Sequence, residues 1–205
     1  MDEGRIGRII VAAAPDMPAL AAGPWDVIEA GQTITDTMQR AFAAVGAPLL
    51  VTTCDAAMLT PDILRMFLDG AESGAELSAG ISPLTSAEVT PDAPPRKGFV
   101  FGDASYVSTN LFAIATASPE PAFAALARAE KRHPPAEMLL SAMSWRLRTP
   151  SVEEVETKAA KLLGVSAALI TLPQPEAGFE VNTALDLMHL RRKWADWVAA
   201  EEDAA

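Results

Sequence analysis

The sequence is poor in cysteine, in basic residues and in long apolar runs, and each shortage excludes a class of protein. A single cysteine, Cys54, cannot form an internal disulfide, so nothing indicates an oxidising compartment. Sixteen Lys and Arg against 27 Asp and Glu give a formal net charge of −11, which disfavours binding to nucleic acid or to an anionic membrane surface. The longest mostly apolar stretches are broken by Pro, Asp, Gly or Thr and are shorter than the roughly 20 residues that cross a bilayer.

The first residues also lack the basic segment and unbroken apolar run of a secretory signal, so we expect a cytoplasmic protein. Half of the 205 residues are hydrophobic and only 6% are aromatic, which favours a globular, helix-rich chain. A chain of this length hides about 70% of the surface that it exposes when unfolded. We therefore predict one domain over residues 1–205.

Short apolar runs alternate with amphipathic segments along the chain. Strands are expected at residues 9–13, 49–54, 76–81, 110–115 and 167–172, with a hairpin at 98–107 after a surface loop at 82–95. Helices are expected from Thr33 or Thr35 to 45, and at 60–70, 118–131, 134–146, 151–163 and 183–200, with a flexible tail at 201–205. This alternation predicts an α/β fold: a three-layer sandwich with a mostly parallel sheet and helices on both faces.

Several helix ends carry local signals of their own. Thr60 precedes a proline, Ser151 stands three residues before Glu154 as in a capping box, and Gly164 supplies a glycine stop. Two apolar stripes at helical spacing predict the buried faces of the first and last helices, namely Ile34, Met38, Phe42 and Val45, and Leu187, Leu190, Trp194 and Trp197.

The candidate functional residues follow expected strands, because ligands of such sheets bind at the carboxyl ends of the strands. Asp55 comes directly after the strand at 49–54, where its carboxylate suits a hard cation such as Mg²⁺. The alternative is an Asp that caps a short turn. Asn182 follows an extended stretch and precedes the last helix, and its alternative role is to satisfy that helix's amino terminus. For Cys54 we favour core packing over a nucleophilic role.

Four ordered segments carry a resemblance to a known family: Gly31-Gln32-Thr33, Leu50 to Asp55 with Leu59-Thr60-Pro61, Ser108 to Phe112, and Glu180 to Thr183 with Asp186-Leu187. From about Ile6 to Trp194, the chain resembles the MobA-like NTP-transferase group of nucleotidyltransferases. The resemblance implies a Rossmann-like fold related to the nucleotide-diphospho-sugar transferases.

The same resemblance implies the reaction and the roles of its residues. A nucleoside triphosphate would give its nucleoside monophosphate to a phosphorylated small molecule, with release of pyrophosphate. Asp55 and Asn182 would hold Mg²⁺ and serve catalysis, Gly31, Gln32 and Thr33 would lie beside the nucleotide, and Asn110 would line the acceptor side. Arg96 and Lys97 are candidates for binding the acceptor's phosphate or carboxylate, or else are ordinary solvated charges.

The chain departs from the family pattern at its start. It lacks the glycine-rich segment, roughly Leu-x-Gly-Gly with a following Arg and Lys, that cradles the triphosphate. Its first expected strand matches the family's second, so a central strand would be missing between residues 9–13 and 49–54. The alternative function is therefore a catalytically inactive, N-terminally shortened binding or interaction module. The gap would leave backbone groups unpaired unless the flanking strands close up, and a homo-oligomer would cover them.

Overall fold

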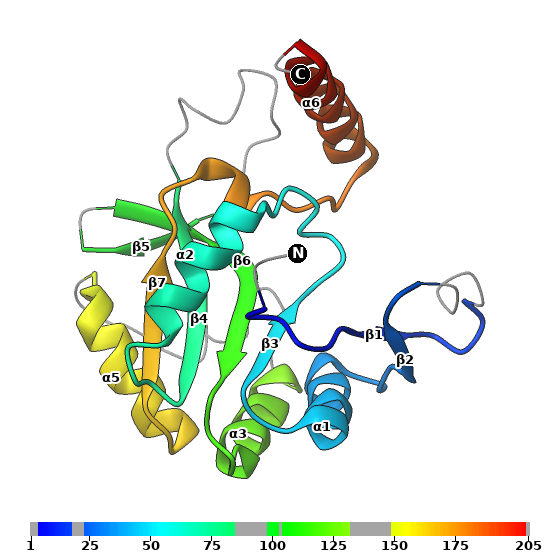
Figure 1. The fold of residues 1–205 in the computed structure, drawn as a ribbon. Coiled ribbons are helices and arrows are strands. Elements are labelled where there is room, and N and C mark those ends of the chain that lie inside the picture. The colour runs from blue at the N-terminus through cyan, green and yellow to red at the C-terminus, as the bar shows by residue number, and fades with distance from the viewer. Residues whose placement is uncertain (1–3, 18–22, 85–97, 103, 132–148, 204–205) are drawn as a thin grey trace.

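The computed structural model describes residues 4–17, 23–84, 98–102, 104–131 and 149–203, with side chains up to residue 195. Its main sheet has the strand order β3-β6-β4-β7, with β5 paired along β6 (Figure 1). These strands are β3 (Leu49–Thr52), β4 (Leu77–Pro83), β5 (Phe99–Phe101), β6 (Ala104–Ile114) and β7 (Ala167–Thr171). Strands β3, β4, β5 and β7 share one direction, and β6 runs opposite to them, because it is antiparallel to β3, β4 and β5 and β7 is parallel to β4.

Helices cover both faces of this sheet, as the sequence predicts. They are α1 (Ile34–Val45), α2 (Pro61–Ala71), α3 (Glu120–Glu130), α5 (Val152–Leu163) and α6 (Ala184–Asp203), with a short 3-10 helix, η3 (Pro175–Gly178). Neighbouring residues of β7 show the two faces: Ile170 packs on the cluster built by α2, whereas Leu169 packs on Val155 of α5. This alternation is the period of two expected of a strand buried on both sides. The α/β sandwich is confirmed.

The helix ends follow the local signals in the sequence. The hydroxyl of Thr33 accepts from the Asp36 N–H at 3.1 Å, and that of Thr60 accepts from the Ile63 N–H at 3.3 Å. Ser151 and Glu154 form the predicted capping box, and Gly164 ends α5 with a left-handed φ of 74°. These caps satisfy backbone groups that a helix cannot satisfy itself.

The expected gap in the sheet is present. Strands β1 (Ile10–Ala13) and β2 (Asp26–Glu29) form a separate parallel pair, and among the described residues β1 pairs only with β2, and β3 only with β6. Helix α1 contacts strands of both sheets, and its Phe42 ring packs edge-on against Phe123 of α3 at 6.0 Å. The flanking strands have therefore not closed up, and the outer backbone edges of β1 and β3 lack strand partners within the described chain.

Residues at the amino terminus tie the two parts together. The Arg5 guanidinium donates to Asp69 at 2.6 Å and to Glu72 at 2.5 Å near the end of α2, before the chain enters β1. The predicted apolar stripe of α1 is only half covered: Ile34 is 43% exposed, and Thr35 is the buried residue of this helix. An amphipathic helix that lies over an incomplete sheet has too little apolar surface beneath it.

Several expected boundaries differ from the structure. Strand β2 was not expected, β4 runs on to Pro83 into the expected loop, and β6 is one continuous strand instead of two segments. The last helix continues to Asp203, so residues 201–203 are helical rather than a frayed tail. The expected helix at 134–146 lies outside the described residues. No helix in the described part of the chain has both the length and the apolar character needed to span a membrane.

The expected buried stripe of α6 is also wrong. Leu187 is 39% and Trp194 57% exposed, whereas Asp186 and His189 are buried on the inner side. The His189 ring stacks on Phe179 with centroids 5.5 Å apart. A polar pair, anchored by the preceding loop, thus decides which side of the helix faces the protein. The side chain of Trp197 lies outside the described residues.

Candidate functional site

Asp55 stands just beyond the carboxyl end of β3, where the chain turns toward α2. Its side chain is half-buried, and its Oδ1 accepts hydrogen bonds from the Thr53 hydroxyl and from Asn110 Nδ2, the latter at 3.3 Å. Both donors are side chains, one from the end of β3 and one from β6. The carboxylate is therefore held across two neighbouring strands instead of capping its own turn.

Asn110 reaches Asp55 because β6 is distorted at this point. Its φ is 54°, the only positive φ of a non-glycine residue in the described chain. The pairing of β4 with β6 jumps from Ala79–Phe112 to Ile81–Ser108, so β6 has two extra residues opposite Gly80. A bulge of this kind turns a side chain out of the regular alternation, and Asn tolerates the left-handed region better than most residues.

Asn182 approaches the same place from the end of the chain. The Val181 N–H donates to the Asp55 carbonyl at 2.9 Å, so the loop before α6 is hydrogen-bonded to the residue that follows β3. The exposed Asn182 side chain donates through Nδ2 to the half-buried Glu180 carboxylate at 3.0 Å. The structure thus brings Asp55, Asn110 and the Asn182 segment together at one edge of the main sheet.

The amino terminus of α6 does not use the Asn182 side chain. The Thr183 hydroxyl accepts from the Asp186 N–H at 3.2 Å, and Asp186 accepts from the Thr183 N–H at 2.7 Å. This reciprocal pair is the cap that the sequence predicts for the helix. Since the cap is complete without it, the Asn182 amide is available for another role.

The acidic and amide side chains gathered here offer hard oxygen donors. They are the carboxylates of Asp55 and Glu180 and the amide oxygen of Asn182, a set that suits Mg²⁺ or Ca²⁺ and not a thiophilic metal. No group of three His, Cys, Asp or Glu side chains that could hold a metal occurs among the described residues, so a cation at this edge would need other oxygen donors as well, and the Asn182 amide is one that the cluster offers. The exposed Cys54 beside it corrects our expectation of core packing.

Gly31, Gln32 and Thr33 lie elsewhere, between β2 and α1. The Gly31 N–H donates to the Thr37 hydroxyl and the Gln32 N–H to Asp36, both at 2.9 Å. From α3, Glu130 accepts from the Ile34 N–H at 2.8 Å and from the Thr35 N–H at 3.3 Å. The backbone N–H groups at the start of α1, which have no partner within the helix, are therefore hydrogen-bonded to side chains. The carboxylates of Asp36 and Glu130 occupy the place where an anion would bind.

These contacts also perturb the two carboxylates. The backbone hydrogen bond from Gln32 holds the pKa of Asp36 below its usual range, with Arg40 adding to the effect. For Glu130, burial alone would raise the pKa, but hydrogen bonds from Thr35, Ile34 and Thr33 outweigh it and lower the pKa. Both groups thus stay negatively charged, which repels a phosphate.

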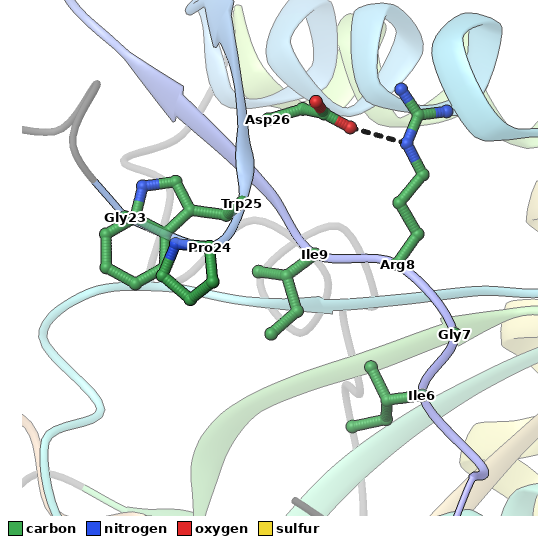
Figure 2. Close-up of a pocket in the computed structure, with 8 residues that line it drawn as sticks. All are labelled: Ile6, Gly7, Arg8, Ile9, Gly23, Pro24, Trp25 and Asp26. Carbon is green, nitrogen blue, oxygen red and sulfur yellow. Dashed lines mark hydrogen bonds and ion pairs between the residues drawn. The ribbon is translucent and has the colours of Figure 1, made fainter.

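Arg96 and Lys97 fall outside the described residues. A cavity of about 310 Å³ lies at the opposite ends of β1 and β2 from Gly31, and Figure 2 shows its lining of Ile6, Gly7, Arg8, Ile9, Gly23, Pro24, Trp25 and Asp26. The basic group of this cavity is already paired, since Arg8 Nε donates to Asp26 at 2.7 Å. None of the residues that line the cavity belongs to the cluster around Asp55.

Sequence reasoning missed two members of the cluster, Thr53 and Glu180. Both belong to segments that carry the family resemblance, but their types and spacing give no indication of a site. Only the hydrogen bonds to Asp55 and Asn182 identify them. The Asp55–Asn110 contact depends on the bulge in β6, which no local signal predicts.

No protein-family model and no curated protein matches the sequence. Solved structures share the fold. A hypothetical transferase from Thermus thermophilus is 24% identical, with a TM-score of 0.69 over 87% of this chain and 78% of that one. A CMP:2-keto-3-deoxy-manno-octonic acid synthetase complexed with CTP is 14% identical, with a TM-score of 0.59 over 93% and 82% of the two chains.

A third structure is 4-diphosphocytidyl-2C-methyl-D-erythritol synthase from Anaerococcus prevotii. It is 7% identical, with a TM-score of 0.52 over 89% of this chain and 79% of that one. At such low identities the similarity establishes the fold alone, and the sheet with its helices on two faces is that fold.

Proposed function

We propose that this protein is a Mg²⁺-dependent nucleotidyltransferase of the MobA-like group, which transfers a nucleoside monophosphate from an NTP to a phosphorylated small molecule and releases pyrophosphate. The observation that carries the proposal is the hydrogen bond from the Val181 N–H to the Asp55 carbonyl. It joins the two segments that the resemblance makes metal-binding. The shared fold supports the proposal, since one solved relative in fold was captured with CTP.

In nucleotidyl transfer, an acceptor oxygen forms a bond to the α-phosphorus while the bond from that phosphorus to the bridging oxygen breaks and pyrophosphate leaves. A divalent cation supplies neutralisation of the phosphate charge. Asp55 and Asn182 would hold this cation, because the hydrogen bonds described above use Oδ1 of Asp55 and Nδ2 of Asn182 and leave Oδ2 of Asp55 and Oδ1 of Asn182 as possible ligands. Asn110 fixes Asp55 Oδ1, and the carboxylate then needs little reorganisation when charge builds up beside it.

A second candidate function is a noncatalytic binding module with the same fold. One observation favours it: the backbone donors at the start of α1 are taken by Asp36 and Glu130, so this segment offers little to a phosphate. In this case the cluster around Asp55 would bind a cation without supporting transfer to an acceptor.

Isothermal titration with Mg²⁺ and GTP, CTP or ATP tests the proposal. We expect heat with at least one nucleotide, and we expect Asp55→Asn to remove it. Asp62→Asn is the matched control, because Asp62 is 80% exposed on α2 and pairs with Arg65. Absence of heat with all three nucleotides, or equal heat from Asp55→Asn, contradicts the transferase and leaves the binding module.

A further inference from the structure

We propose that Glu180 is a positioning residue that turns Asn182 into an oriented cation ligand and supplies the negative charge that an amide lacks. The inference rests on the proposed function, because it assumes a cation between Asp55 and Asn182. The inference goes beyond the proposed function because it assigns a role to Glu180, a side chain that only the hydrogen-bond geometry identifies.

The first argument concerns the direction of the Asn182 amide. An amide side chain presents an oxygen on one side and an NH₂ group on the other, and the two can exchange by rotation. An ionised carboxylate only accepts hydrogen bonds, so the group that faces Glu180 at 3.0 Å must be the Asn182 NH₂. The amide oxygen therefore points away from Glu180, and an oxygen is the only atom of the amide that binds a hard cation.

The second argument concerns the backbone that carries both residues. Val181 lies between them and is fixed by its hydrogen bond to the Asp55 carbonyl, while on the other side of the Asn182 Cα the Thr183 N–H donates to Asp186 at 2.7 Å. The main chain is therefore held on both sides of the amide. What stays adjustable is the rotation of the side chain, and Glu180 removes that freedom.

The third argument concerns charge. A site with Asp55 and a neutral amide has one formal negative charge, which binds a divalent cation weakly. Glu180, which is half-buried, places a second carboxylate within one amide group of the ligand position. In this way a carboxylate can strengthen a neutral ligand without itself contacting the cation.

Asp55 is likewise held by a hydrogen bond between a carboxylate and an amide. Its Oδ1 receives the Asn110 NH₂ group and the Thr53 hydroxyl, so the remaining oxygen is the one presented to a ligand. Each of the two expected ligands is thus oriented by one carboxylate–amide hydrogen bond. In one pair the carboxylate is the ligand, and in the other the amide is.

The test measures Mn²⁺ affinity by electron paramagnetic resonance of the free ion, with Mg²⁺ in competition, and needs no catalysis. We expect Glu180→Gln to weaken binding about 10- to 100-fold, the usual effect of removing a partner that orients a metal ligand. The double variant Glu180→Gln with Asn182→Asp exchanges the amide and the carboxylate, keeps the hydrogen bond and should restore affinity to within a few fold. Glu153→Gln, at an exposed carboxylate of α5, is the control for net charge.

Each outcome is informative. If the wild type binds no Mn²⁺, or binds it as Asp55→Asn does, the proposed cation site itself fails. If the wild type binds and Glu180→Gln binds equally well, the role of Glu180 is overturned while the site stands. If Glu180→Gln binds Mn²⁺ weakly and the double variant does not restore the affinity, Glu180 is a direct ligand of the cation, and this result also overturns the proposal. Should Glu180→Gln fail to fold, as seen by circular dichroism, the exchanged pair alone decides between these results.

Discussion

Replacing Asn110 by Ala and by Gly separates the two roles that the structure gives this residue. Both variants lose the hydrogen bond from Nδ2 to Asp55, but only alanine must also adopt the left-handed backbone at φ 54°. Left-handed conformation costs an ordinary residue about 1–2 kcal/mol. Glycine avoids that cost but loses about 0.5–1 kcal/mol more conformational entropy on folding.

The difference between these two effects leaves Asn110→Ala less stable than Asn110→Gly by about 0.5–1 kcal/mol. In a domain of this size, that lowers the melting temperature by roughly 1–4 °C. Urea unfolding followed by circular dichroism measures both free energies. Ser105, which lies on the same strand, is the control: there alanine must be more stable than glycine, because the backbone is regular. If alanine is also the more stable residue at position 110, the bulge is not strained and the explanation of the site is wrong.

Three further predictions concern stability and association. Because the pKa of Glu130 is lowered in the folded state, its ionised carboxylate stabilises the fold above the usual glutamate pKa, and this stabilisation is lost as the pH falls through the lowered pKa. In urea unfolding, Glu130→Gln should therefore make the free energy of unfolding decrease less steeply at acid pH than in the wild type. Gly80→Ala should cost about 1–3 kcal/mol by overpacking, because its Cβ would lie 2.1 Å from the Thr109 hydroxyl, while Gly7→Ala, with nothing within 4 Å, should not destabilise. Light scattering should detect self-association through the edges of β1 and β3, which have no strand partner among the described residues, and a monomer that melts cooperatively at every concentration would contradict it.

The elements that local chemistry specifies were predictable from the sequence. The caps at Thr33, Thr60 and Ser151 and the glycine stop at Gly164 set helix ends within a residue or two, because each signal acts through its own backbone neighbours. The proximity of the Asp55 and Asn182 segments was predictable for a different reason. Each follows an extended segment, and segments that end at one edge of a sheet present their next residues together.

The elements that depend on tertiary contacts were not. Strand β2 is four residues long, with an acidic residue at each end, and its pairing with β1 outweighs a weak local preference. The buried side of α6 is set by Asp186 and His189, against the apolar periodicity, since the first caps the helix and the second stacks on Phe179. The bulge that aims Asn110 is likewise a property of the pairing of β4 with β6 and not of either strand alone.

Because β1 and β2 form a sheet separate from the main sheet, an experiment can distinguish the transferase from the binding module. The side chains of the Asp55 cluster come from β6, from the loop that follows β3 and from the loop before α6, whereas Gly31, Gln32 and Thr33 lie between β2 and α1. A cation can therefore bind at Asp55 whatever happens at the gap. A nucleotide that also contacts residues 31–33 needs both parts in fixed register, and no strand joins them in the described chain. A protein that binds Mn²⁺ through Asp55 but gives no heat with any nucleotide would thus locate the loss of function at the gap, and would favour the binding module.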